Sequence, residues 1–281
     1  MTSGLTIATR NDALLEQAEP FLVAAPWHRH LFDLAPFGLE VPDANVIDPL
    51  RVASERFLLL LQTLDRLTFG PEGMPMPRWV FYNAAEVPGG IFGFARRAHT
   101  LPPPVREALG LADADEGLVP LSMYVAIPVR PPVVWFGHNL ASLNPVFPDL
   151  HLKGLASITK ALALKAFRCE SQVGATQWDS NALHIHTRFG PLDLITAWTP
   201  AHSDPATLTY RFDLTDTKIR HAAGDPAVSL TYPGADLEIA AGDHDAMKAL
   251  QVRIEAGERF VVAGPPRRHE GERRVPVARV T

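Results

Sequence analysis

The chain is predicted to be an α+β protein with a mixed, mostly antiparallel twisted sheet flanked by helices. Short alternating or β-branched runs recur along the sequence, and a few longer segments space their apolar residues as helices do. The 26 prolines among 281 residues exceed the usual share of about 5%, which favours loops and short strands over long helices. A strand, a helix and a second strand follow one another over residues 133–178, between pairs of adjacent strands. This order indicates hairpins combined with one parallel crossover.

The composition is that of an ordinary globular protein, with 47% hydrophobic and 20% charged residues. A net charge of -5 argues against a general nucleic-acid binder. The most apolar window, Phe57 to Leu61, is far too short to span a bilayer, and the N-terminus shows no signal-peptide pattern. A lone cysteine, Cys169, suits a reducing compartment. We therefore expect a cytoplasmic protein that acts on a small molecule, without nucleic-acid or membrane partners.

The first third of the chain is expected to begin with a strand and two helices. Leu5 to Thr9 alternates and is β-branched, which predicts a strand. Asn11 and Asp12 offer an N-cap for a helix through Ala13 to Val23. Residues 24–50 lack a clear period and are interpreted as mixed helix and loop, whereas Pro49 to Leu67 has one broad apolar helical face.

The middle of the chain is expected to form two strand pairs. Arg78 to Tyr82 and Ile91 to Ala95 flank a Pro-Gly-Gly turn, which predicts a hairpin. Leu121 to Val129 and Val133 to Leu143 predict a second pair. Between the pairs, Leu101 to Gly117 reads as a short helix and an acidic loop that form an insertion.

The central segment continues with a helix over Leu155 to Phe167, a strand over Gln172 to Trp178 and a helix from Asp179. Strands over Leu192 to Thr199 and Leu208 to Leu214 follow. The main domain is therefore expected to cover residues 1–214, with insertions at 24–77 and 96–120.

Residues 215–281 are expected to form a C-terminal extension, because their pattern is weaker. It contains predicted strands at Ala227 to Tyr232, Leu237 to Ile239 and Arg259 to Ala263, and a helix at Asp243 to Ile254. The last fifteen residues are charged and are interpreted as a loose tail. The extension is a candidate for a homodimer contact, a lid or a small domain.

The loop from Pro148 to Ala156 is the strongest candidate for a binding site. It feeds backbone N–H groups into the first turn of the following helix, where the amides are unsatisfied and the helix dipole adds positive charge. Gly154 lets the backbone approach a phosphate, Ala156 keeps the first turn small, and Lys153 adds a cation. The alternative is an ordinary strand-to-helix turn that contains a glycine.

This loop resembles a motif of the GCN5-related N-acetyltransferase (GNAT) superfamily: Gln or Arg, two residues, Gly, one residue, then Gly or Ala. His151, Gly154 and Ala156 stand at those places, so His151 departs from the family pattern.

The segment Asp179 to Gly190 resembles a second family motif: Asn, two residues, then Ala-Leu-x-Leu-Tyr-x-x-x-Gly. Asp179 stands at the Asn place and His186 at the Tyr place. The opening residues are also similar to the family's first strand and helix. The resemblance covers roughly residues 5–23 and 78–214.

The resemblance implies a GNAT-like fold and acyl transfer from acetyl-CoA, or another acyl-CoA, to the amine of a small molecule or peptide. Coenzyme A would lie between the strand that ends near Val146 and the strand that starts near Gln172, with its pyrophosphate on the amides of Leu152 to Ser157. The acyl carbonyl would lie beside the strand Asn139 to Asn144, whose backbone can polarise it. The implied cofactor-binding residues are Asn144, Val146, His151, Leu152, Lys153, Gly154, Leu155, Ala156, Ser157 and Asp179.

Three residues are candidates for proton transfer. His138 and Glu86 are candidate bases for the amine proton, and His138 is favoured by a pKa near neutrality. By the resemblance, His186 would protonate the leaving thiolate. A hydrogen-bonded strand histidine is the alternative for His138.

Other interpretations stay open. Without the family's Tyr and Gln or Arg, the domain could be an acyl-CoA sensor that does not catalyse. The pairs His28/His30 and His184/His186 suggest, more distantly, a His-rich metal enzyme of β fold, although no metal is expected. Cys169 is interpreted as a small buried hydrophobe rather than a nucleophile. The residues expected to pack in or beside strands of the core include Trp79, Trp135, Trp178 and Trp198.

Overall fold

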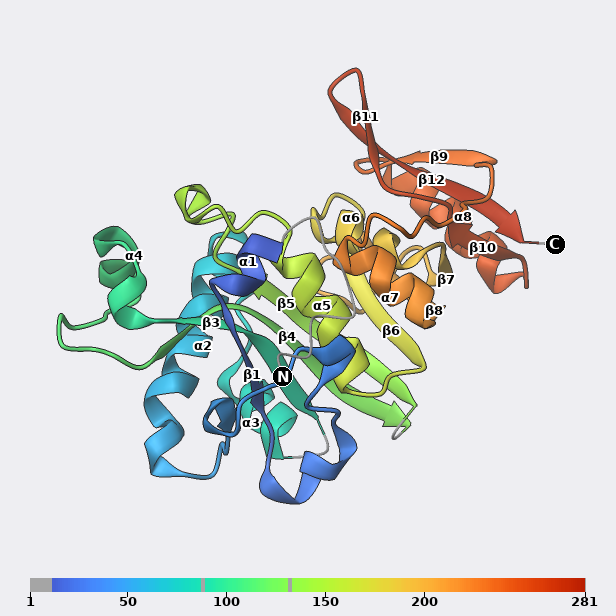
Figure 1. Cartoon of the computed structure of the whole chain (residues 1–281). Helices are drawn as coiled ribbons and strands as arrows, with labels where there is room; N and C mark the ends of the chain where they lie inside the picture. Colours follow the sequence, from blue (N-terminus) through green and yellow to red (C-terminus); the bar gives the residue numbers. More distant parts are fainter. Residues whose placement is uncertain (1–11, 87–88, 131–132, 281) are drawn as a thin grey trace. The chain divides into compact units, whose positions relative to one another are not determined.

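The computed structural model describes residues 12–86, 89–130 and 133–280 (Figure 1). The chain divides into two compact units, one of Met1–Cys169 with Ala223–Pro226 and the other of Glu170–Ala222 with Ala227–Thr281. Each unit combines helices with mostly antiparallel strands, which confirms the α+β class. None of the helices in the described part of the chain has the length and hydropathy that a bilayer span requires.

The strands of the first unit lie in the order β5-β4-β3-β1-β2. The pairs are antiparallel except for β1 with β2, which is parallel. Apolar side chains fill β1 and β3, and Phe21, Phe92 and Phe94 are fully buried. The strands are β1 (Glu19–Val23), β2 (Val46–Ile47), β3 (Gly90–Arg97), β4 (Leu118–Arg130) and β5 (Val134–Ser142).

Helices α2 and α5 cover opposite faces of this sheet. Ser122 of β4 shares a hydrogen bond of 2.6 Å with Thr159 of α5, whereas Asn139, directly opposite Val125 of β4, contacts Asp65 of α2. Ser122 and Val125 are an odd number of residues apart, so their side chains point to opposite faces. The helices of the unit are α1 (Asp12–Glu16), α2 (Glu55–Phe69), α3 (Arg78–Glu86), α4 (Pro103–Ala108) and α5 (Leu155–Ala166). Short 3-10 helices, η1 to η7, lie at Pro26–Leu31, Pro36–Gly38, Asp43–Asn45, Val52–Ser54, Gly70–Glu72, Ala98–Thr100 and Pro148–Leu150.

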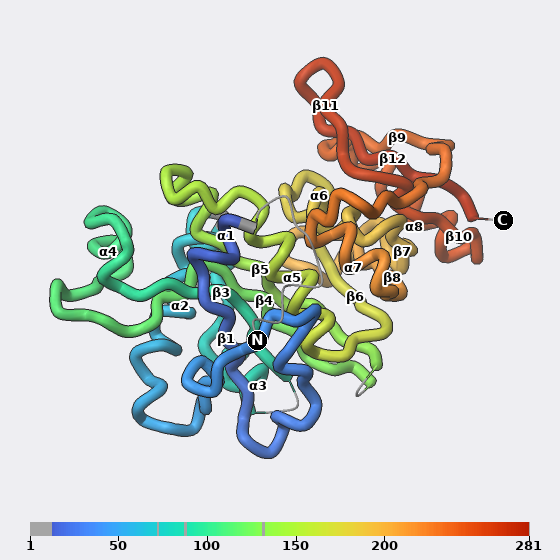
Figure 2. Tube along the Cα trace, in the orientation of Figure 1, coloured from blue at the N-terminus to red at the C-terminus, as the bar shows by residue number. Residues whose placement is uncertain are grey.

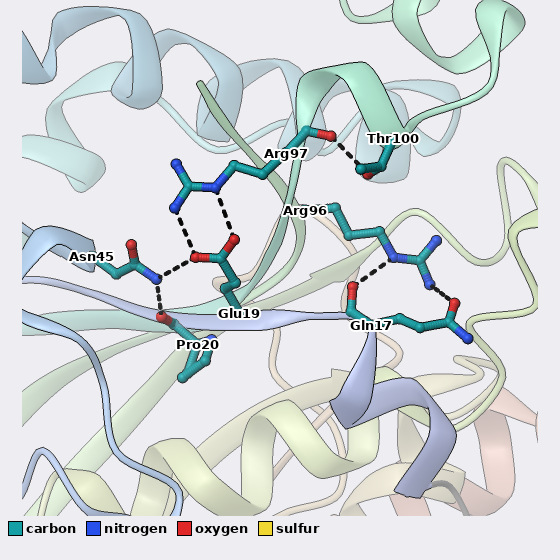
Figure 3. A network of polar contacts seen from close by, with 7 residues as sticks. All are labelled: Gln17, Glu19, Pro20, Asn45, Arg96, Arg97 and Thr100. Carbon is teal, nitrogen blue, oxygen red and sulfur yellow. Dashed lines mark hydrogen bonds and ion pairs between the residues drawn. The ribbon is translucent and has the colours of Figure 1, made fainter. Parts of the chain in front are cut away.

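Strand β1 is held by a polar network that we call the β1 clamp: Glu19, Arg97, Asn45, Gln17 and Arg96 (Figure 3). The Arg97 guanidinium donates to both carboxylate oxygens of Glu19, at 2.8 and 2.9 Å. Asn45, which is 1% exposed, donates 3.1 Å bonds to Glu19 Oε2 and to the Pro20 carbonyl. Arg96 donates to the carbonyl and side-chain oxygens of Gln17. These bonds tie β1 to β3 and to the turn that precedes β2.

The strands of the second unit lie in the order β11-β12-β10-β7-β8-β6, with β9 paired to β12. Helix α8 begins at a capped residue, because the Asp243 side chain accepts from the Ala246 N–H. The strands are β6 (Ser171–Gln177), β7 (Leu192–Thr196), β8 (Thr207–Asp213), β9 (Leu237–Ala240), β10 (Arg259–Val262), β11 (Arg267–His269) and β12 (Glu272–Val280). The helices are α6 (Ala182–His186), the 3-10 helix η8 (Thr187–Phe189), α7 (Asp216–Ala223) and α8 (His244–Glu255).

Most elements predicted after residue 100 are confirmed, whereas two in the first third are wrong. The helix expected to run to Val23 ends at Glu16, and residues 19–23 are strand β1. Pro20 would interrupt a helix interior, and three buried apolar residues in a row suit a central strand. The expected hairpin is also wrong, because residues 78–86 form α3. There Val80, Phe81, Ala84 and Ala85 form the buried face of a helix. The predicted strand at Leu5 to Thr9 lies outside the described residues.

Corrections in the second unit concern the extension. Residues 227–232 are not a strand, and α7, which was not expected, precedes them. The expected loose tail is the hairpin of β11 and β12, in which Val275, Val277 and Ala278 are buried. Arginines on both sides of this short buried run, Arg273, Arg274 and Arg279, conceal the strand in the sequence. The domain boundary expected at Leu214 remains a prediction. The chain passes from the first compact unit to the second between Cys169 and Glu170.

Candidate functional site

A β-bulge lies in the middle of β5. Val125 of β4 pairs with Asn139, but the next residue, Ala126, pairs with Gly137, so His138 is the extra residue. A bulge leaves its extra residue outside the regular ladder of hydrogen bonds. The bulge therefore sets His138 apart from its neighbours in β5, next to Asn139, which keeps its place opposite Val125.

The loop that follows β5 leads directly into the start of α5. Figure 2 traces this backbone from β5 through η7 into the helix. His151 and Gly154 have positive φ angles of 53° and 97°, so the chain turns sharply twice before the helix begins. Gly154 is the N-cap residue, and no described side chain caps the helix there. The Leu155 N–H already donates to the Leu152 carbonyl at 3.0 Å, so an anion at this helix start would be bound by the amides that follow Leu155 in the first turn.

The residues of this segment that are expected to bind a cofactor differ in the burial of their side chains. The side chains of Leu152 and Leu155 are buried, at 1% and 0% exposure, so only their backbones could serve a ligand. The side chains of His151 and Lys153 are exposed, so the His151 ring and the Lys153 ammonium group are accessible from solvent. Ser157 is buried, and Ala156 is half-buried in the first turn.

Asn144 and Val146 belong to the turn that connects β5 to η7. The Asn144 N–H donates to Ser142 Oγ at 3.3 Å, and the Val146 N–H donates to the Leu143 carbonyl at 3.1 Å. Both amides are therefore used within the turn, and their side chains are half-buried.

The two candidate bases lie on different elements of the first unit. His138 is the bulged residue itself and is exposed, and desolvation by the surrounding chain lowers its pKa. Glu86 is the last residue of α3 rather than part of a hairpin, and the Tyr82 hydroxyl bonds to it. A Cβ placed on Gly89 would lie 2.6 Å from the Ala84 carbonyl and 3.0 Å from that of Ala126. Gly89 therefore lies against β4 beside the bulge.

His186 and Asp179 lie in the second unit. His186 is 6% exposed, and its ring lies 5.1 Å from that of Tyr210, in an aromatic stack continued by Phe212 and Phe189. Asp179 is exposed and is not the N-cap of α6; that residue is Asn181, because α6 begins at Ala182. That these two residues share a site with the β5–α5 segment stays a prediction.

The sequence interpretation missed a buried carboxylate beside β5. Asp65 of α2 is 1% exposed and accepts hydrogen bonds from the Met76 N–H, at 2.6 Å, and from Asn139 Nδ2. Burial raises the pKa of Asp65, and the bonds from Met76 and Asn139 do not offset this effect. The available signal was an Asp one turn after Leu61, on the apolar face of the predicted helix.

A buried lysine was also missed. Lys160 of α5 is 0% exposed, and its Nζ lies 5.7 Å from the centre of the Tyr124 ring. Burial lowers the pKa of Lys160 well below its ordinary value, although the nearby Cys169 acts in the opposite direction. Ten of the twelve α5 residues are buried, so a charged residue in this helix had few exposed positions to occupy.

The other sequence interpretations concern a metal site, Cys169 and the tryptophans. Among the described residues, no three His, Cys, Asp or Glu side chains gather as a metal site would require. Cys169 is 7% exposed, as expected for a small buried side chain. Trp135 and Trp178 are core residues, whereas Trp79 lies on α3 and is 62% exposed, so its expected place in the core is wrong.

Comparison with known proteins adds no relative: no family model, curated protein or solved structure matches the chain.

Proposed function

We propose that the protein is an acyl-CoA-dependent N-acyltransferase, with acetyl-CoA as the expected cosubstrate and an amine of a small molecule or peptide as the acceptor. The carrying observation is that one continuous segment, β5 to α5, contains a β-bulge at His138 and a helix start at Gly154 that no described side chain caps. The bulge at His138 supplies amides for a thioester carbonyl, and the start of α5 at Gly154 supplies amides for a pyrophosphate.

The two donor sets have separate tasks in this proposal. The amides at the helix start bind charge that does not change during the reaction, so they contribute affinity. The bulge amides face an oxygen that becomes negative when the amine attacks, so they contribute to the rate. His138, exposed beside the reacting carbonyl, is the proposed base for the amine proton.

Titration of the protein with acetyl-CoA by calorimetry, followed by a thiol-release assay with a panel of amines, tests the proposal. Saturable binding with thiol release in the presence of an amine supports a transferase. A chain that binds no acetyl-CoA contradicts the proposal.

A sensor that binds acyl-CoA without transferring the acyl group is the second candidate. The observation that favours it is the burial of His186 against Tyr210, since a general acid has to reach the leaving thiolate. Tight acetyl-CoA binding without thiol release from any amine would select the sensor.

The variant His186→Phe separates these two functions at one residue. Phe can keep the ring contact with Tyr210, so the fold is expected to persist. If His186 protonates the thiolate, kcat falls about 100-fold and the dissociation constant of acetyl-CoA stays the same. The exposed His184→Phe on the same helix is the matched control. Equal kcat in both variants would remove His186 from the mechanism.

A further inference from the structure

The side chain of Asn139 is held in one orientation by a buried acid. Its Nδ2 donates to Asp65 Oδ1, while Asp65 Oδ2 accepts from the Met76 N–H. An amide that donates through nitrogen to one side presents its oxygen to the other side. The Asn139 Oδ1 is therefore directed away from Asp65.

The place of Asn139 matters as much as its orientation. It directly follows the bulged His138, opposite Val125 of β4. Asn139 is half-buried, whereas Asp65 behind it is 1% exposed. The amide thus lies between a buried carboxylate and solvent, at the level of the bulge amides.

The buried carboxylate is an unusual choice for a purely structural contact. Burial raises the pKa of Asp65, so holding the ionised form there costs stability. Within the described residues, its hydrogen-bond donors are the neutral N–H groups of Met76 and Asn139 rather than a cation. A neutral side chain of the same shape could cap the Met76 amide without that cost.

We propose that Asn139 binds the acceptor amine through its Oδ1, and that Asp65 is the positioning residue that fixes this amide. The inference rests on the proposed acyltransferase function. It names the acceptor class as a primary amine, because the neutral, nucleophilic nitrogen must carry one N–H that donates to Oδ1 and a second N–H that the base removes.

The chemistry balances without a further reactant. The amine lone pair forms the C–N bond, the thioester C–S bond breaks, the nitrogen gives up one proton, and the thiolate of coenzyme A takes one. Asn139 exchanges no proton in these steps. A neutral amide oxygen also does not lock the amine as an ammonium ion, as a direct carboxylate contact would.

Steady-state kinetics of Asn139→Ala, Asn139→Ser and Asp65→Asn test the inference. The probes are acetyl-CoA and a panel of a primary alkylamine, an aromatic ethylamine, a polyamine, an amino sugar and a lysine peptide. We expect acceptor KM to rise about 10-fold in the Asn139 variants, and less in Asp65→Asn, because an amide can still accept from Asn139. The acetyl-CoA dissociation constant should change less than about twofold in each.

Two variants serve as matched controls. Asn83→Ala makes the same change at a half-buried asparagine of α3. Thr68→Val removes a neighbouring contact between α2 and β5, since Thr68 Oγ1 lies 3.5 Å from the Ser142 carbonyl. Both should keep acceptor KM unchanged, even if they lower the melting temperature.

The outcomes distinguish this inference from the function on which it rests. Wild-type protein that binds no acetyl-CoA overturns both. Wild-type protein that binds acetyl-CoA but acylates no amine of the panel selects the sensor and overturns the acceptor role. Active wild-type protein with unchanged acceptor KM in both Asn139 variants overturns the acceptor role alone, and so does an equal loss of acetyl-CoA affinity.

Discussion

The β1 clamp and the β5 segment both concentrate polar groups on the first unit's sheet, and they use them in opposite ways. In the clamp, Glu19 faces the Arg97 guanidinium and receives a further bond from Asn45 (Figure 3). Beside β5, Asp65 of α2 is more deeply buried and is contacted by neutral donors. The clamp thus pairs its charges within the fold. In the proposed site, by contrast, backbone donors of the β5–α5 segment and the Asn139 oxygen serve a ligand.

The pKa values of the two carboxyl groups move apart accordingly. Burial acts to raise the pKa of Glu19, but hydrogen bonds from Arg97 and Asn45 and the Arg97 charge lower it overall. Burial raises the pKa of Asp65, and its neutral partners do not compensate. We interpret a carboxylate whose cost of burial is offset by its partners, such as Glu19, as structural. A carboxylate whose cost of burial is not offset, such as Asp65, points to a site for a ligand.

The largest expected effect is that of Gly154→Asp on acetyl-CoA binding. A carboxylate at the N-cap would occupy the first amides of α5 and repel a pyrophosphate, so the dissociation constant should rise at least about 100-fold. Calorimetry measures it. Gly110→Asp, at a loop glycine that also has positive φ and faces open space, is the matched control and should bind as the wild type does. Equal affinities of the two variants would remove the loop from the site.

The next effect compares two asparagines by stability. Asn45→Ala removes the buried amide that donates to Glu19 Oε2 and to the Pro20 carbonyl, and should lower the free energy of unfolding by about 1–3 kcal/mol. Asn139→Ala takes one donor from Asp65, but water can enter the space that this half-buried side chain leaves and bond to the carboxyl group, so the change should cost less than about 1 kcal/mol. Urea denaturation measures both. A larger cost at Asn139 would make the β5 segment structural and weaken the contrast.

The smallest effect is the opposite pH dependence of the two acids. The lowered pKa of Glu19 means that its stabilising contribution is present above the ordinary Glu pKa of about 4.3 and is lost as pH falls through the folded value. The raised pKa of Asp65 means that the free energy of unfolding increases as pH falls through the folded value toward about 3.9.

Denaturation of the wild type, Glu19→Gln and Asp65→Asn between pH 7 and about pH 2 gives the two slopes. Stability relative to the wild type should improve on acidification for Glu19→Gln and worsen for Asp65→Asn. Added salt should weaken the Glu19 effect more, because its ion pair is partly exposed. Slopes of the same sign would contradict the comparison.

The sequence predicts the β5–α5 segment well because its signals are local. The apolar run of the strand, the glycine before the helix and the apolar helix itself are all adjacent in the chain. It predicts β1 poorly because the residues after Asp12 begin a helix that Pro20 then excludes. The α3 helix is missed because a short aromatic run suits a strand as well as a helix.

The side chains around the bulge could not be assigned from sequence in the same way. A bulge at His138 depends on the register between β4 and β5, and no local residue type marks it. Asp65 meets Asn139 across 74 positions of sequence, so their contact follows from packing rather than from a motif. An acid within the apolar face of α2 is the signal that would have directed attention there.

The most direct test of the central claim is an NMR titration of the amide-labelled protein with acetyl-CoA. We expect the amide resonances of His138, Asn139 and Ala156 to shift together with one dissociation constant, while those of Asn45 and Arg97 in the β1 clamp stay in place. Resonances that do not move in the β5–α5 segment, or shifts confined to the clamp, would contradict the assignment of this segment as the acyl-CoA site.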